Sequence, residues 1–96
     1  MAFVNIGYGN VVNSEKVISI VSPEAAPVKR MIQGAKDDGK AIDATCGKKT
    51  KAVLVMENNS LVLSALLPDT IASRFNHKGT GMENMEEKYK RIGGWV

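Results

Sequence analysis

The sequence predicts an α+β fold: a small antiparallel β-sheet with one main helix and a short C-terminal helix. Two observations lead to it, several short runs rich in β-branched residues between turn signals and one long amphipathic stretch. The length of 96 residues suits one hydrophobic core, and the aromatic content of 5% makes that core aliphatic. We expect residues 1–75 to form the domain and residues 76–96 a polar, mobile tail, with a helical turn over residues 83–91 left open.

Extended segments are expected in the N-terminal quarter of the chain. Residues 3–6 read as a short strand and residues 7–10 as a break or bulge. Val11 and Val12 extend the strand structure as far as a polar turn at residues 13–16. Residues 17–21 are β-branched at four of their five positions, so they predict a second strand.

The main helix is expected to follow that strand. Ser22 is a typical N-cap residue, Pro23 tolerates the first turn, and Glu24 suits the positive end of the helix dipole. Pro27 limits how early the regular helix can begin. Gly39 is expected to end the helix. An apolar stripe at the i, i+3, i+4, i+7 spacing is predicted to face the core, with Met31 as core filler: Val28, Met31, Ile32 and Ala35.

The remaining strands are expected in the second half of the domain. Residues 41–45 and 50–56 are predicted to pair as a hairpin with its tip at residues 46–49. Residues 60–67 are expected to form the last strand, with Met56 before it as a further core methionine. Pro68 then marks the start of a short helix over residues 71–75.

Two of these strands are apolar on both of their faces. Residues 52–56 and 61–66 lack the alternation of apolar and polar residues that a half-exposed antiparallel strand shows. Because the main helix covers only one face of the sheet, a second subunit is the economical cover for the other. The alternative is that the N-terminal strand and the terminal helix cover that face within the chain.

Positive charge is concentrated in the first half of the chain. The formal net charge is +3, and residues 1–55 hold eight Lys or Arg against five Asp or Glu, whereas residues 56–96 hold five against five. Lys48 and Lys49 lie at the expected hairpin tip, with Lys51 two residues on. Cations projecting from a rigid turn suit contact with nucleic-acid phosphates. A solubilising surface loop, or a sheet edge protected by lysines, remains the alternative interpretation.

Signals for catalysis, metals and membranes are weak. Cys46 is the only cysteine, which rules out an intramolecular disulfide and a multi-cysteine zinc site. Its use as a nucleophile would need a base, and His77, the only histidine, lies in the expected tail. Residues 47–50 loosely resemble the end of a phosphate-binding P-loop, but that motif needs a glycine five residues before Gly47, where this chain has Ile42. We therefore expect no enzyme, cofactor, metal or small-molecule substrate, and, without a membrane span or signal peptide, a cytoplasmic protein.

An ordered set of motifs resembles the RemA-like family of extracellular matrix regulatory proteins. The resemblance runs without an obvious gap from about Phe3 to Phe75 and rests on Asn5-Ile6-Gly7-Tyr8-Gly9-Asn10, residues 20–24, residues 26–30, residues 42–45 and residues 47–53. It implies a bacterial transcription regulator of matrix (biofilm) genes with a fold similar to LytTR-type DNA-binding domains. Subunits of the family join head to tail in a closed ring whose basic rim engages double-stranded DNA.

The resemblance also implies functions for particular residues. The DNA-contact positions of the family fall on Lys16, Lys48 and Lys49, and Pro27 matches a position that the family needs for helix geometry or subunit contact. The family favours arginine at the contact positions. Lysine binds phosphate as a point charge without the planar fork of arginine, so we expect non-specific affinity to survive and shape-based discrimination to weaken. Cys46 stands where the family usually has an aromatic residue.

Two other binding functions remain open. An oligomeric scaffold or adaptor would bind protein and use its lysines only for solubility, and its partner binding would be insensitive to salt. Binding of RNA is less favoured, because the chain lacks the aromatic platforms on which single-stranded bases stack.

Overall fold

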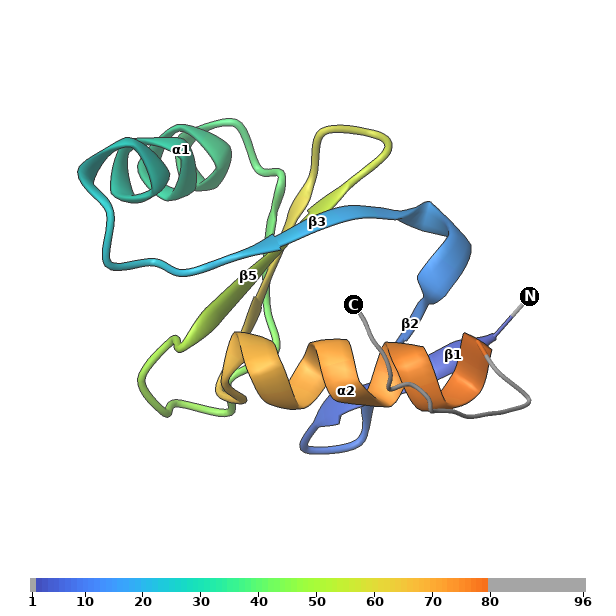
Figure 1. Cartoon of the computed structure of the whole chain (residues 1–96). Helices are drawn as coiled ribbons and strands as arrows, with labels where there is room; N and C mark the ends of the chain where they lie inside the picture. The colour runs from blue at the N-terminus through green and yellow to red at the C-terminus, as the bar shows by residue number, and fades with distance from the viewer. Residues whose placement is uncertain (1, 80–96) are drawn as a thin grey trace.

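The computed structural model describes residues 2–79 and contains two sheets and two α-helices. A two-stranded antiparallel sheet pairs β1 with β2, and a four-stranded sheet has the order β3-β5-β6-β4 (Figure 1). The predicted α+β class is confirmed. The elements in chain order are β1 (Phe3–Gly7), β2 (Asn10–Asn13), the 3-10 helix η1 (Ser14–Lys16), β3 (Val17–Val21), α1 (Ala26–Asp37), β4 (Ala41–Asp43), β5 (Ala52–Met56), β6 (Leu61–Ser64) and α2 (Pro68–Gly79).

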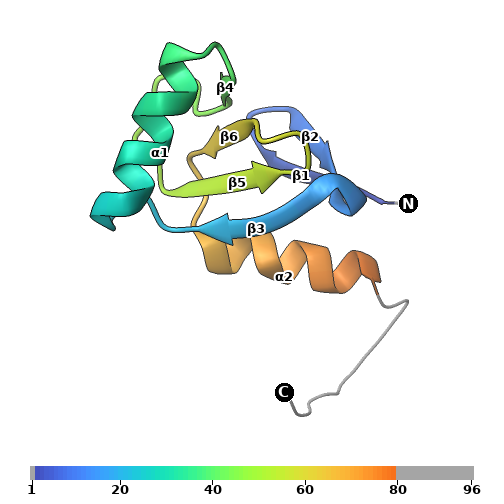
Figure 2. The same cartoon turned by 90° about the horizontal axis from the view of Figure 1, so that it is seen from above.

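The four-stranded sheet is mixed rather than purely antiparallel. β5 pairs antiparallel with both β3 and β6, whereas β4 runs parallel to β6, with Ile42 opposite Val62. The predicted hairpin between residues 41–45 and 50–56 is therefore wrong, because β6 lies between β4 and β5 (Figure 2). The connection of residues 44–51 is long enough to cross the end of β6, so the turn within it does not join neighbouring strands.

Both faces of the four-stranded sheet are covered within the chain. On one face Leu54 and Val62 pack with Val4 and Ile6 of the β1–β2 hairpin and with Ile71 of α2. The other face is covered by α1, and Figure 1 shows the two helices on opposite sides of the sheet. The expectation that a second subunit covers a face of the sheet is therefore wrong, and the alternative of cover within the chain is confirmed.

Helix α1 begins later than expected and exposes part of its predicted stripe. The Ser22 hydroxyl group accepts a hydrogen bond from the Glu24 backbone N–H at 3.3 Å, so Ser22 stabilises a turn before the helix instead of capping it. Pro27 lies in the first helical turn and is exposed. Met31 is 43% exposed, so the prediction that it fills the core is wrong. The other three residues of the stripe pack against the sheet: Val28, Ile32 and Ala35.

Helix α2 is as long as α1, although a short helix was predicted over residues 71–75. Both helices have 12 residues. Ile71 is fully buried, and the Arg74 guanidinium donates a hydrogen bond to the Asn5 carbonyl at 2.9 Å, which fastens α2 to β1. The helix continues to Gly79, and the helical turn considered over residues 83–91 lies outside the described residues. The domain boundary at residue 75 and the likeness to LytTR-type domains stay predictions.

Candidate nucleic-acid interface

The connection between β4 and β5, residues 44–51, is here named the lysine loop. Both of its ends are fastened to the backbone of β6. The Ala44 N–H donates a hydrogen bond to the Leu63 carbonyl at 2.9 Å, and the Lys51 N–H donates one to the Ser64 carbonyl at 2.8 Å. The loop therefore crosses the end of β6 with its two ends fixed to the sheet.

A tight turn shapes the first half of the lysine loop. Cys46 and Gly47 have φ angles of +55° and +81°, as the two central residues of a type I′ turn do, and the Lys48 N–H donates to the Thr45 carbonyl at 3.0 Å. The Asp43 carboxylate accepts hydrogen bonds from the Thr45 N–H at 2.9 Å and from the Thr45 hydroxyl group at 2.6 Å. Because Thr45 is buried, these bonds give the turn a fixed base.

Three predicted contact residues share this loop. Lys48, Lys49 and Lys51 are all exposed, and none of them forms an ion pair with another described residue. Their ammonium groups are therefore available to a polyanion, on a loop whose backbone is held by the sheet. This is the arrangement that phosphate contact requires.

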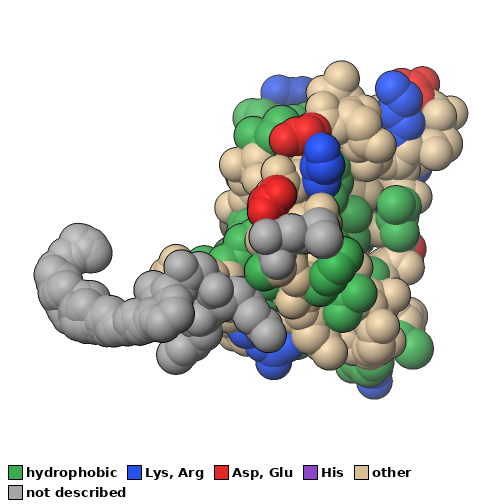
Figure 3. Space-filling view, turned by 90° about the vertical axis from the view of Figure 1, so that its right-hand side faces the viewer, with side chains coloured by type: hydrophobic (Ala, Val, Ile, Leu, Met, Phe, Trp, Pro, Cys, Tyr) green, Lys and Arg blue, Asp and Glu red, His purple; other side chains and the backbone are tan. Residues whose placement is uncertain are grey.

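Lys16, the fourth predicted contact residue, lies elsewhere. It ends η1, and its ammonium Nζ is 3.5 Å from Oε1 of Glu57, which follows β5, whereas the lysine loop precedes β5. At about 3.4 Å per residue along a strand, β5 places Glu57, and with it Lys16, about 20 Å from Lys51 at the end of the lysine loop. The side of the molecule that carries η1 shows charges of both signs beside hydrophobic side chains (Figure 3). The predicted residues therefore form two groups within one subunit.

A groove runs between the β1–β2 hairpin, β4 and the turn that joins β5 to β6. Its volume is about 580 Å³. Val11 and Ile42, both exposed, line it together with Asn10 and the Lys16–Glu57 ion pair. The other apolar residues that line the groove are Ile6, Val12, Ala44, Met56 and Val62. The groove thus offers an apolar lining next to a charged pair.

In the part of the chain that it describes, the structure gives no further function to the cysteine, to a metal site or to a membrane span. Cys46 is a free, exposed cysteine. Within residues 2–79, no group of three or more His, Cys, Asp or Glu side chains is arranged to hold a metal ion. No helix in the same range is both long and apolar enough to cross a bilayer. The function expected for Pro27 is compatible with its place in the first turn of α1 and stays a prediction.

Sequence reasoning missed the function of Asp43 in this site. An aspartate two residues before a threonine is the local signal, because its carboxylate can accept from the backbone N–H two positions later. The Thr45 hydroxyl group, and then the Thr45 backbone N–H, hold the pKa of the Asp43 carboxyl below its ordinary value. A folded-state pKa below the unfolded one adds stability that is complete above about pH 4 and is lost as the pH falls through the folded value.

We expect Asp43→Asn to lower the melting temperature at neutral pH, because a neutral amide accepts weaker hydrogen bonds than a carboxylate. The difference from the wild type should shrink as the pH falls from about 4 through the lowered pKa of the folded carboxyl, because the carboxylate is then protonated in the folded protein too. Thermal unfolding of both proteins across this pH range measures it. Asp38→Asn, at the end of α1, removes the same charge as a control. A difference that stays constant with pH would contradict the inferred charge-assisted bonds.

A family model matches the same residues that carry the resemblance described above. Residues 3–75 match the family described as RemA-like, Extracellular matrix regulatory protein A-like. Over 75 residues the chain is 65% identical to a "Putative regulatory protein" of Lachnoclostridium phytofermentans, covering 78% of this chain and 82% of the relative. A protein of the same name from Carboxydothermus hydrogenoformans is 51% identical over 87 residues, covering 91% and 95%. A Bacillus cytotoxicus relative is 53% identical over 78 residues, covering 81% and 90%.

Proposed function

Because the chain belongs to the RemA-like family of bacterial regulatory proteins, we propose that it regulates transcription of extracellular matrix (biofilm) genes by binding double-stranded DNA. In this proposal it acts in the cytoplasm as a ring-shaped homo-oligomer, without a cofactor and without catalysis. Lys48, Lys49 and Lys51 contact DNA phosphates, and Lys16 provides a second contact at the other end of β5.

The lysine loop is the observation that carries the proposal. Three exposed ammonium groups project from a loop whose two ends and one turn are held by backbone and carboxylate hydrogen bonds. A solubilising loop needs exposed lysines but does not need a fixed base. Phosphate contact gains from such a base, because little side-chain and backbone order has to be created on binding.

One subunit offers too few cations for tight binding of DNA. A ring repeats the contacts in a fixed geometry and gains affinity from already paired sites. The outer strands β3 and β4 are each paired on one side only, and each carries an exposed isoleucine, Ile18 at 63% and Ile42 at 57%. Ile18 is the extra residue of a bulge in β3. If the β3 edge of one copy meets the β4 edge of the next, the contact is head to tail. Such contacts close into a ring when the rotation between neighbouring copies divides a full turn evenly.

Light scattering of the full chain, with and without a promoter-length duplex at low and moderate salt, tests the proposal. We expect a defined oligomer that binds the duplex and releases it as salt rises, because phosphate contacts are lost to competing counterions. A monomer, or an oligomer indifferent to DNA at low salt, would contradict it.

The apolar groove favours a second candidate function, an oligomeric scaffold that binds a protein partner. Val11 and Ile42 are exposed in its lining, and apolar grooves suit protein segments better than phosphates. The two functions differ in their response to salt. Binding of protein through an apolar groove should survive moderate salt, whereas binding of DNA through the lysine loop should not.

A further inference from the structure

Tyr8 occupies a backbone conformation that its residue type disfavours. It is the first central residue of the turn that joins β1 to β2, where Gly7 is paired with Asn10. Its φ angle is +55° and that of Gly9 is +80°, so the turn has the two positive φ angles of type I′. This position normally holds Asn, Asp or Gly, and a bulky residue with positive φ is an outlier.

The interior of the protein does not account for this tyrosine. Its side chain is 55% exposed, and no described residue forms a hydrogen bond with its hydroxyl group. An asparagine would form the same turn with less backbone strain. Strain that the fold does not need is retained most often where a side chain has to be presented for function.

Hydrogen bonds place this turn beside the lysine loop. The amide Nδ2 of Asn10 donates to the Gly7 carbonyl at 3.0 Å and to the Ala44 carbonyl, the first residue of the loop, at 3.4 Å. It also donates to the Tyr8 carbonyl at 3.4 Å. The Asn10 side chain therefore joins the turn that carries Tyr8 to the loop that carries the lysines.

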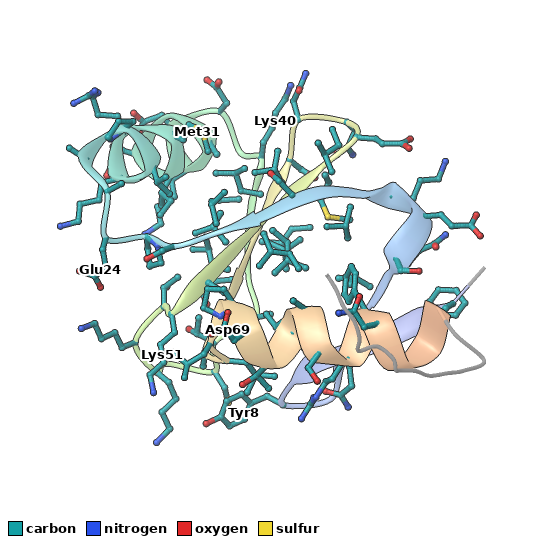
Figure 4. The ribbon with its side chains drawn as sticks, in the orientation of Figure 1. Tyr8, Glu24, Met31, Lys40, Lys51 and Asp69 are labelled. Carbon is teal, nitrogen blue, oxygen red and sulfur yellow. The ribbon has the colours of Figure 1, made fainter. Side chains whose placement is uncertain are left out.

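Ser64 makes a second link, between the end of β1 and the lysine loop. Its buried hydroxyl group donates to the Ile6 carbonyl at 2.8 Å, and its carbonyl accepts from the Lys51 N–H at 2.8 Å. Gly7 lies so close to Leu66, which follows β6, that an added Cβ would be 3.3 Å from the leucine Cγ. Figure 4 shows Tyr8 and Lys51 at the same end of the molecule, opposite the end that carries Lys40.

We propose that Tyr8 is part of the DNA-contact surface of the lysine loop and that Asn10 positions it there. The Tyr8 hydroxyl group donates a hydrogen bond to a phosphate oxygen of the duplex, and its ring lies against the neighbouring deoxyribose. Tyrosine is one of the neutral side chains that bind phosphate oxygens in protein–DNA complexes, and such contacts fix register without reading sequence. This inference rests on the proposed DNA binding.

Tyr8→Asn tests the proposal in a variant whose turn is less strained. We expect its melting temperature to equal or exceed that of the wild type, and its affinity for duplex DNA at low salt to fall about fivefold or more. Because Tyr8 carries no charge, the slope of log affinity against log salt should not change, whereas loss of a lysine contact flattens it. Tyr8→Phe should lose the hydroxyl bond and keep the ring, so its affinity should lie between the two.

Phe3→Asn is the matched control, because Phe3 is also 55% exposed and lies at the opposite end of β1. Its affinity for DNA should change by no more than about twofold, which is less than the loss of about fivefold expected for one hydrogen bond. Undiminished DNA binding by Tyr8→Asn, together with weakened binding by Lys48→Ala/Lys49→Ala, would overturn the inference and leave the proposed function standing. A wild-type protein that binds no duplex at all would overturn both.

Discussion

Replacing Lys48 and Lys49 together by alanine is expected to lower the affinity for duplex DNA about tenfold or more at low salt, without changing the mass of the oligomer. Each lysine neutralises one phosphate, and each neutralised phosphate contributes about −0.9 to the slope of log affinity against log salt. The slope should therefore flatten by about 1.8 for each subunit in contact with the duplex. Both side chains are exposed, so the fold should tolerate the change.

The matched control is the double change Lys29→Ala/Arg30→Ala on α1, which removes the same two charges from an exposed helix face. Only a small loss is expected there, because long-range attraction weakens while the contacts themselves remain. Lys16→Ala tests the second group, at the other end of β5, and should cost less than the double change because Glu57 already offsets that charge. Equal DNA binding by the wild type and Lys48→Ala/Lys49→Ala would exclude the lysine loop as the contact.

Local patterns predicted the elements better than their pairing. The strand over residues 17–21 and the turn after Val12 are where β-branched and polar residues placed them, because these signals act within a few residues. The partner of β4 was predicted wrongly. Two strands with a glycine turn between them look alike in sequence whether they pair with each other or enclose a third strand, and only the packing of β6 decides.

Helix boundaries failed for related reasons. The Ser22 hydroxyl group bonds within its own turn, so the residue that looked like an N-cap stabilises the segment before α1. The helix expected over residues 71–75 reaches from Pro68 to Gly79, and Ile71 and Phe75 anchor it on a core that β1 and β5 also build. Most helical stability in a folded protein comes from such packing, so a local pattern marks the anchored turns better than the ends.

The candidate site was predictable in its residue types and not in its geometry. Lys48, Lys49 and the Gly47 turn stand out in the sequence, since clustered cations and a glycine are local features. The separation of Lys16 from them, and the position of Tyr8 beside them, depend on which strands adjoin β5 and β6. Contacts such as Asn10 to Ala44 link residues far apart in sequence, so no local pattern reveals them.

Ile42→Lys is expected to reduce the proposed ring to smaller species and to lower DNA affinity about a hundredfold or more, through loss of avidity. Ile42 is 57% exposed on the outer strand β4, so the change should leave the fold of one subunit intact. A lysine on an exposed edge opposes pairing with another chain, because its ammonium group would have to be buried in the contact. Light scattering and duplex titration of the same samples measure both effects.

The sign of the charge makes this variant decisive. Ile42→Lys adds a cation, which by itself would strengthen attraction to DNA, so weaker binding by a variant with an unchanged melting temperature points to lost assembly. Met31→Lys on α1 adds the same charge at another exposed apolar residue and should bind DNA at least as tightly as the wild type does. If β3 of one copy meets β4 of the next, Ile18→Lys should have the same effect as Ile42→Lys. An oligomer that survives Ile18→Lys but not Ile42→Lys would instead indicate that two β4 edges face each other, which gives a closed dimer and contradicts the ring.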